Sequence, residues 1–478
     1  MEWLADTAWL MWSIVLPLFG AMFAFLFPRR AAVIGLSGVF LTALAALGTL
    51  LQVAFEGPRV YRLGGWGAPL GIDLLADGLS VLMLAMTAVV GVAVSIYARV
   101  YLAGTPDKVR RFWPLWLFLL AAMNGLFLSG DIFNLYVTLE LLGLSAVALV
   151  ALTGSAPALW GAMRYLLVSL LGSLAYLVGV ALMYYAYGTL DLALLGERAQ
   201  GGVVLAVPLA AMIAGLLLKT GLFPFHVWLP PAHGSARAPV SALLSGLVVK
   251  ASFYLVLRLW FTFVPEGQGV PLLLGLLGVA AIFWGSIQAL RQKRLKLLVA
   301  YSTVAQLGYL FVAFPLAGVD ASLAWGGSIY LALSHALAKG AMFLAAGSIM
   351  TQGGHDEIAE LDRVVDRMPL TLAAFALSGI SLAGLPPSGG FVGKWMLLQA
   401  AMIEGQWFWV VVIIVGGLLT ATYVFRVLGF AFTKSPHEHE AHDVPPTMEW
   451  TALLLALGAV MLGFVAPWAL PLLDGVLP

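Results

Sequence analysis

The chain has 478 residues, of which 62% are hydrophobic and 10% are charged, with a formal net charge of +1 and a mean hydropathy of +1.00. Soluble globular domains carry about 45–50% apolar and about 25% charged residues, so this composition excludes a water-soluble globule and predicts an integral membrane protein. Cysteine is absent, which excludes iron–sulfur clusters, thiolate metal sites and disulfides.

Fourteen apolar runs follow one another along the chain, and each is long enough to cross a bilayer, which takes about 20 residues. They are separated by charges and by glycine- or proline-rich breaks, and they cover residues 9–27, 32–55, 75–98, 112–129, 132–152, 159–187, 203–229, 238–263, 271–290, 297–317, 322–350, 369–403, 406–432 and 449–472. The first run follows the acids Glu2 and Asp6 and no basic segment, so we expect no cleavable signal peptide. We predict an all-α polytopic membrane protein of about 14 transmembrane helices.

Basic residues alternate between rich and poor loops. The loops after odd-numbered runs contain Arg29, Arg30, Lys108, Arg110, Arg111, Arg237, Arg291, Lys293, Arg294, Lys296, Arg363, Arg367 and Lys434. The loops after even-numbered runs contain only Arg59, Arg62 and Arg198. Cytoplasmic loops carry the excess of lysine and arginine, so we expect both termini on the extracytoplasmic side.

Two runs are interrupted by glycine and proline. Run seven contains Lys219-Thr-Gly-Leu-Phe-Pro224-Phe-His226-Val-Trp-Leu-Pro230-Pro231, and run twelve contains Gly384-Leu-Pro386-Pro387-Ser-Gly389-Gly390-Phe-Val-Gly393-Lys394. Proline removes a backbone donor and glycine loosens a helix, so each segment should unwind where protein or water satisfies the freed groups. Paired interruptions five runs apart indicate two inverted five-helix repeats, each with a broken helix and with an ion path between them.

These repeats divide the chain into four parts. We expect three N-terminal helices in residues 1–111 and the first five-helix repeat in 112–264. The second repeat should occupy residues 265–434, and a cytoplasmic loop with the last helix should occupy 435–478.

A few ionisable residues lie well inside the apolar runs. They are Glu140, Lys219, Lys250, Arg258, Lys339 and Lys394, together with His226 and His335. A charge at the bilayer centre costs about 2.5–3.5 kcal/mol on translocon scales, so ionisable residues there are functional candidates. Three of them also have simpler interpretations: Glu140 as a structural partner of a lysine, Arg258 reaching the headgroups, and His226 bonded to the opened backbone.

The buried residue types suit proton transfer. His335 and Lys339 are four residues apart and share one helical face, so they can exchange a proton directly or through one water. Desolvation lowers the pKa of a buried lysine by up to about 3–5 units, and a nearby carboxylate raises it again. A lysine–glutamate pair that opens and closes is therefore a proton switch, and histidine relays protons near neutral pH.

One polar loop contains metal-ligating residue types. Its sequence is His437-Glu-His-Glu-Ala-His442-Asp443, but histidine-rich tracts are only compositional hints, so we interpret it as a solvated loop and expect no metal. A third class of protein, a membrane oxidoreductase with haem, needs paired axial ligands. Only His226 and His335 lie well inside the runs, so we expect no cofactor.

The buried residues belong to a series of ordered phrases. These are Asp77-Gly-Leu-Ser80, Asp131-Ile-Phe-Asn-Leu-Tyr-Val-Thr-Leu-Glu140, Lys219-Thr-Gly-Leu-Phe-Pro-Phe-His-Val-Trp-Leu-Pro-Pro-Ala-His233, Ala238-Pro-Val-Ser-Ala-Leu-Leu-Ser-Gly246 before Lys250, Lys296-Leu-Leu-Val-Ala-Tyr-Ser-Thr-Val-Ala-Gln-Leu-Gly308, Ser334-His-Ala-Leu-Ala-Lys339 and Ala383-Gly-Leu-Pro-Pro-Ser-Gly-Gly-Phe-Val-Gly-Lys394. Together they resemble the antiporter-like subunits shared by Mrp-type cation/proton antiporters, respiratory complex I and membrane-bound hydrogenases. The fold implied by the resemblance, fourteen helices with two inverted five-helix repeats, agrees with the count above.

The resemblance also implies roles. Glu140 and Lys219 would form a gating ion pair, and Lys250 would be the central lysine. His335 and Lys339 would form the relay of the second half, and Lys394 would be the terminal lysine in the broken helix. Some complex I members carry glutamate at the place of Lys394, which disfavours that subtype.

The resemblance leaves two assemblies open. The Phe-Asn-Leu-Tyr phrase before Glu140 is similar to the D-type subunit of Mrp antiporters, whereas the phrase from Pro224 to His233 is more similar to complex I and hydrogenase members. We expect a proton-translocating subunit of a multisubunit Mrp-type Na+/proton antiporter in a bacterial or archaeal cell membrane, with other membrane subunits as partners and no redox centre of its own. The alternative is an antiporter-like subunit of a complex I-like NADH–quinone oxidoreductase or a membrane-bound hydrogenase.

Overall fold

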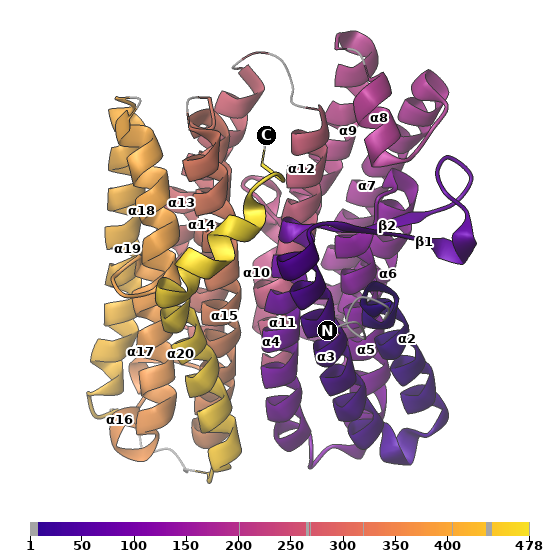
Figure 1. Cartoon of the computed structure of the whole chain (residues 1–478). Helices are drawn as coiled ribbons and strands as arrows, with labels where there is room; N and C mark the ends of the chain where they lie inside the picture. Colours follow the sequence, from indigo (N-terminus) through magenta and orange to yellow (C-terminus); the bar gives the residue numbers. More distant parts are fainter. Residues whose placement is uncertain are drawn as a thin grey trace.

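The computed structural model describes residues 8–199, 201–263, 267, 269–318, 320–403, 405–435 and 442–477. These residues form a bundle of long helices (Figure 1). Within them, 13 helical segments are long and apolar enough to cross a membrane, and the shorter apolar helix Pro369–Ala383 begins a further, broken crossing. The prediction of about fourteen all-α crossings is confirmed, whereas the acids Glu2 and Asp6, used above to argue against a signal peptide, lie outside the described residues.

The crossings agree closely with the apolar runs of the sequence. Those of the first half are α2 (Trp9–Leu26), α3 (Ala31–Glu56), α4 (Gly78–Tyr101), α5 (Pro106–Leu128), α6 (Ile132–Ala151), α7 (Ala156–Tyr187), α9 (Val203–Thr220) with η3 (Phe225–Trp228) and α10 (Leu229–Ser235), and α11 (Ala238–Leu243) with η4 (Leu244–Val248) and α12 (Val249–Phe263). Those of the second half are α13 (Gly269–Arg291), α14 (Leu295–Leu316), α15 (Ala321–Gly353), α17 (Pro369–Ala383) with α18 (Gly389–Ile403), α19 (Trp407–Ala431) and α20 (Pro446–Ala469). The connections contain η1 (Pro28–Arg30), β1 (Arg59–Arg62), η2 (Leu63–Gly65), β2 (Asp73–Ala76), α8 (Leu192–Arg198), η5 (Ile358–Glu360), α16 (Val364–Arg367) and η6 (Leu470–Leu473).

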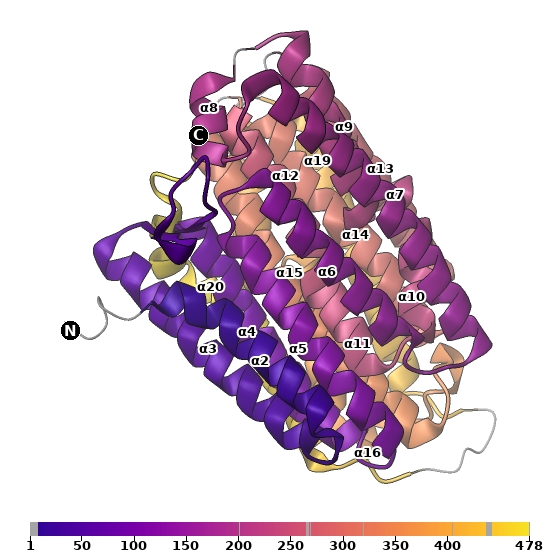
Figure 2. The same ribbon diagram turned by 90° about the vertical axis from the view of Figure 1, so that its right-hand side faces the viewer.

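The centre of the bundle is formed by α12, α14 and α15. The most apolar stretches of Ala238–Phe263 and Ala321–Gly353 are buried throughout, and Figure 2 shows α12, α14 and α15 behind the outer helices α6 and α7. Outer helices expose large apolar side chains instead, such as Phe25 at 72% and Trp468 at 73%. An apolar exterior of this extent requires lipid as its solvent, so the buried polar groups of the central helices must find partners inside the protein.

Both predicted breaks are present. The chain turns at Gly221 (φ +73°) after α9 and at Gly384 (φ +85°) after α17, in the left-handed region that glycine adopts without steric cost. The short helices α8, which precedes α9, and α16, which precedes α17, lie at opposite ends of the bundle (Figure 1). The two broken crossings therefore run in opposite directions, as the inverted repeats require.

An antiparallel hairpin, which the apolar runs of the sequence do not predict, lies between α3 and α4. Strands β1 and β2 pair with Arg59 opposite Ala76 and Arg62 opposite Asp73. The amide of Gly130 donates to the Asp73 carbonyl at 2.9 Å, which joins the hairpin to the connection between α5 and α6. Each strand has only four residues, and so short a run carries little periodic signal.

Arg258 does not reach the headgroups, so that interpretation of the sequence was wrong. Its guanidinium forms a two-pronged ion pair with Asp77, with Nη2 2.5 Å from Oδ1, and Nε donates to the Tyr254 hydroxyl at 2.8 Å. Asp77 also caps the N-terminus of α4, because its Oδ1 accepts a hydrogen bond of 2.9 Å from the backbone amide of Ser80. The pair ties α12 to the start of α4, and the partner lies 181 residues away in the chain, where no local pattern points to it.

Candidate functional site

Glu140 on α6 and Lys219 on α9 form the ion pair that the resemblance implies. Lys219 Nζ lies 3.3 Å from Glu140 Oε1 and donates to Ser169 Oγ at 3.0 Å. Ser173 donates to the same carboxylate oxygen. The lysine side chain is 5% exposed and the glutamate side chain 21%, so the cation is enclosed while the carboxylate reaches towards the side of the bundle. The two serines of α7 therefore give each ion a neutral hydrogen-bond partner besides the opposite charge.

Glycines bring α7 and α9 close enough to enclose this pair. A Cβ atom at Gly215 would lie 2.2 Å from the carbonyl oxygen of Gly172, and one at Gly172 would lie 2.7 Å from that of Gly215. On α6, a Cβ atom at Gly143 would lie 2.8 Å from Ser169 Oγ and 3.4 Å from Lys219 Nζ. Larger residues would push the helices apart at the point where the charges meet.

Lys250 follows a π-helical turn, η4, at the centre of the bundle. Its Nζ donates to the Ser245 carbonyl within that turn, and the side chain is 0% exposed. Ser245 Oγ shares a hydrogen bond of 2.8 Å with Thr303 of α14. A Cβ atom at Gly246 would lie 3.2 Å from the Ala336 carbonyl of α15. Single π turns often mark functional sites, and this one places a buried ammonium against a carbonyl instead of a carboxylate.

His335 and Lys339 share one face of α15 but are not hydrogen-bonded to each other. Lys339 Nζ donates to the Val299 carbonyl at 3.0 Å and to Ser302 Oγ, both on α14. Neither ring nitrogen of His335 has a hydrogen-bond partner within the described part of the chain, and the residue is buried. The proton exchange between them stays a prediction, and it requires Lys339 to swing away from α14 or a water to bridge the gap.

Lys394 lies in α18, beside the second break. Its Nζ donates to the carbonyls of Leu382 at 2.8 Å and Ala383 at 3.2 Å, the last residues of α17. It also lies 4.0 Å from the centre of the Tyr309 ring. A Cβ atom at Gly384 would lie 2.6 Å from Lys394 Cδ, so the glycine serves both the turn and the close approach of the lysine. The ammonium is therefore bound by the free carbonyls at the C-terminal end of α17 and by the face of an aromatic ring.

The predicted residues lie on helices that follow one another across the bundle. Figure 1 shows α6 and α9 on one side, α12 and α15 in the middle and α18 on the other side. Thr220, next to Lys219, donates to Ser252 of α12 at 3.0 Å, which joins the first break to the helix that carries Lys250. His335 lies within electrostatic range of three lysines, Lys250, Lys339 and Lys394. The arrangement is a row of buried proton-binding groups that crosses the protein parallel to the membrane.

Two family models match most of the chain. The model described as "NADH:quinone oxidoreductase/Mrp antiporter, TM" matches residues 129–420, which include all the predicted site residues. The model described as "NADH-Ubiquinone oxidoreductase (complex I), chain 5 N-terminus" matches residues 67–113. The chain belongs to the NADH:quinone oxidoreductase/Mrp antiporter family.

Relatives in this family cover almost the whole chain. The NADH-quinone oxidoreductase subunit N of Desulforudis audaxviator is 36% identical over 96% of this chain and 98% of its own length. The D-type subunit of the Na(+)/H(+) antiporter of Alkalihalophilus pseudofirmus is 31% identical over 95% and 93%. A chain of the Mrp complex from Dietzia sp. has the same fold, with a TM-score of 0.89 at 24% identity over 98% and 96%. The resemblance inferred from the ordered phrases is confirmed, and the chain is a multi-pass membrane protein.

Two further buried ionisable residues, His233 and Lys296, were not among the predicted site residues. His233 on α10 is 0% exposed, stacks on Phe343 of α15 at 4.9 Å, and has no hydrogen-bond partner for its ring nitrogens among the described residues. Lys296 was counted as a loop residue, but it is 2% exposed and donates to the Ala236 carbonyl. His233 lies within electrostatic range of Lys296, Lys339 and Lys250. In the sequence, His233 stood out by its place after the two prolines of the broken run and as the last residue of the phrase that begins at Lys219.

His226 belongs to a different environment from the buried lysines. Its Nε2 accepts a hydrogen bond of 3.1 Å from Trp284 Nε1 on α13, and its ring stacks on Phe223. The bond to Trp284, together with an interaction with the backbone at Pro224, fits a structural role beside the break.

The described residues contain no group of three or more potential metal ligands. The histidine-rich loop falls mostly outside them, since residues 436–441 are not described and only His442 and Asp443 are.

Proposed function

We propose that this chain is the proton-translocating subunit of a multisubunit Mrp-type monovalent cation/proton antiporter, with Na+ as the exchanged cation. The observation that carries the proposal is a row of buried lysines that begins at the Glu140–Lys219 pair and continues through α12, α15 and α18. Lys250, Lys339 and Lys394 have carbonyl, hydroxyl or aromatic partners but no carboxylate partner among the described residues. Uncompensated ammonium groups are costly inside a membrane protein, and a role in moving charge explains their presence.

In this proposal the Glu140–Lys219 pair controls the proton affinity of the groups behind it. Two unit charges about 4 Å apart interact by about 4 kcal/mol at an effective dielectric constant of about 20. Opening or closing such a pair changes the field at the next lysine by enough to decide which of two neighbouring groups holds a proton. The hydroxyls of Ser169 and Ser173 stabilise the open arrangement, and the row from Lys250 to Lys394 passes the change across the bundle.

A second candidate function couples the same row to redox chemistry in a partner subunit. The 36% identity to a NADH-quinone oxidoreductase subunit N over nearly the full length favours it. In that assembly this chain would still carry protons, but electron transfer in another subunit would drive them.

A transport measurement separates the two functions. Inverted membrane vesicles containing the complete complex are first acidified inside, and the internal pH is followed with a fluorescent dye. Antiport predicts that added NaCl collapses the pH gradient without any electron donor. Proton pumping that needs an electron donor and shows no response to Na+ or K+ would replace the antiporter proposal with the redox one.

We also propose the division into repeats at residues 112–264 and 265–434, flanked by residues 1–111 and 435–478. The broken crossings support it, because each lies at the equivalent place of its repeat and they run in opposite directions. We propose other membrane subunits as partners, in the inner membrane of a bacterium or archaeon, with both termini extracytoplasmic.

Single cysteines test this orientation, because the chain has none of its own. Ser155, exposed at the start of α7, lies on the side proposed to be cytoplasmic, and Leu70, 86% exposed in the hairpin loop, lies on the other. In intact cells an impermeant maleimide should label Leu70→Cys and spare Ser155→Cys, and both should react after lysis. The reverse pattern in intact cells would invert the topology.

A further inference from the structure

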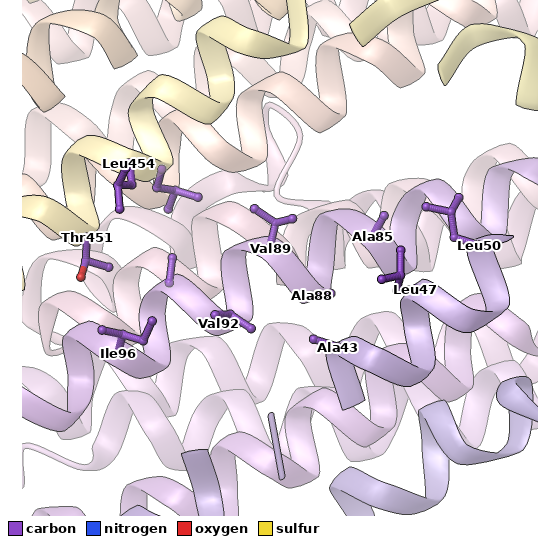
Figure 3. Close-up of a pocket in the computed structure, with 12 residues that line it drawn as sticks. Ala43, Leu47, Leu50, Ala85, Ala88, Val89, Val92, Ile96, Thr451 and Leu454 are labelled. Carbon is purple, nitrogen blue, oxygen red and sulfur yellow. The ribbon is translucent and has the colours of Figure 1, made fainter. Parts of the chain in front are cut away.

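An open apolar groove runs along the outside of the bundle between α3, α4 and α20. Figure 3 shows alanine, valine, leucine and isoleucine side chains of α3 and α4 on one wall and Thr451 and Leu454 of α20 on the other. Its volume is about 560 Å³. Val89 and Leu454, on opposite walls, are 51% and 62% exposed, so the groove opens sideways to whatever surrounds the helices.

A second hollow of about 290 Å³ continues the groove towards the other end of α20, and it shares Leu50, Ala85 and Val89 with the first. It reaches Leu333 and Leu337 of α15. Because α-helical residues two apart point to nearly opposite sides, these leucines lie on the face of α15 away from His335. A molecule bound in the groove would therefore contact α15 on the face opposite His335.

The dimensions of the first hollow match one leaflet of a bilayer. Ile96 and Ala85 at its two ends are eleven residues apart on α4, which is roughly 16 Å of helix, about half of the ~30 Å hydrocarbon core. Its lining over this length is almost entirely apolar, which suits the acyl chains of one leaflet. The exposed Trp450 and Trp468, at 51% and 73%, stand at the two ends of α20, as tryptophans do at membrane interfaces.

An arginine stands at the mouth of this hollow. Arg99 follows Val92 and Ile96 at helical spacing, so it continues the same face of α4 beyond the last apolar residue. It is exposed, and no carboxylate or other hydrogen-bond partner contacts it within the described part of the chain. A guanidinium is suited to bind phosphate with two parallel hydrogen bonds.

We propose that this groove binds an anionic phospholipid, with its acyl chains between α4 and α20 and its phosphate at Arg99. A zwitterionic lipid carries its own cation beside the phosphate and gains less from the arginine. Basic groups between transmembrane helices attract anionic headgroups in this way. The bound chains fill the space behind α15 and hold α4 and α20 against it, independently of which ion the protein transports.

Photolabelling in vesicles tests the proposal. The complex containing the full-length chain is placed in phosphatidylcholine vesicles with a trace of phosphatidylglycerol that carries a photoactivatable group in mid-chain, or with the matching phosphatidylcholine probe. Labels should fall on residues 85–96 and 451–455, with about fivefold more from phosphatidylglycerol, since one basic group near a membrane surface contributes about 1 kcal/mol towards an anionic lipid.

Two variants and one control complete the test. Arg99→Gln should abolish the excess of phosphatidylglycerol label, and Ala88→Phe should lower labelling by both probes because it fills the groove. Arg164→Gln, at an exposed arginine of α7, should change neither. Equal labelling by both probes in the unmodified protein, or an unchanged excess in Arg99→Gln, would reduce the groove to non-selective lipid contact. Cross-linking of these residues to another membrane protein in native membranes would instead make the groove a subunit interface.

Discussion

Lys394→Ala is expected to lower proton translocation per folded complex by about 100-fold or more, as loss of a positioned proton-transfer group commonly does. The lysine is the last predicted member of the row, and its ammonium sits on the carbonyls of Leu382 and Ala383 and over the Tyr309 ring. Lys394→Arg should fail to a similar extent, because a guanidinium keeps its proton at any physiological pH and cannot release it. Both variants are measured by transport in vesicles, normalised to folded complex from size-exclusion chromatography.

The arginine variant decides between transport and structure at this position. If Lys394 only neutralises the open end of α17, arginine would do so equally well and the alanine variant would mainly lower the amount of folded complex. Normal transport in Lys394→Arg would therefore remove the residue from the proton path. Lys394→Glu should keep partial activity, since a carboxylic acid can also bind and release a proton. Lys434→Ala, at an exposed lysine beyond α19, is the matched control and should behave as the unmodified protein.

Removing either charge of the Glu140–Lys219 pair should also abolish transport. Glu140→Gln keeps the shape of the side chain and its bond with Ser173 but takes away the charge that Lys219 faces at 3.3 Å. Lys219→Ala leaves the carboxylate without its cation, and Lys219→Arg should lose most activity because it cannot deprotonate. Breaking a fully buried pair can cost about 3–5 kcal/mol, and the partial exposure of Glu140 reduces that cost, so the complex should still assemble.

The serine beside the pair supplies the matched control for this second prediction. Ser169→Ala removes a hydrogen bond of 3.0 Å to Lys219 but leaves both charges, so it should cost about 1 kcal/mol and reduce transport by less than about tenfold. Glu140→Asp should retain part of the activity. Full transport in Lys219→Ala, or a Ser169→Ala variant as inactive as Glu140→Gln, would show that charge coupling is not the role of the pair.

The sequence by itself determined the number and limits of the crossings. Lipid cannot satisfy polar backbone or charged side chains, so each crossing must appear as a long apolar run, and the runs agree with the helices to within a few residues. Proline and glycine act on their own stretch of backbone, which is why the breaks after Thr220 and Ala383 were visible locally. The few buried ionisable residues could also be recognised locally, because a charged side chain inside the bilayer costs free energy whatever its partners are.

Only the tertiary structure decided what each buried group contacts. Several of these contacts join segments that are far apart in the chain. Arg258 pairs with Asp77, Lys339 donates to a carbonyl of α14, and the Lys394 ammonium lies over the Tyr309 ring. His233 and Lys296 were missed because burial near the end of a crossing depends on how neighbouring helices pack and not on local hydropathy. The cost of a buried charge is a property of one residue and can be read from sequence, whereas the partner that compensates it is a property of the packed bundle.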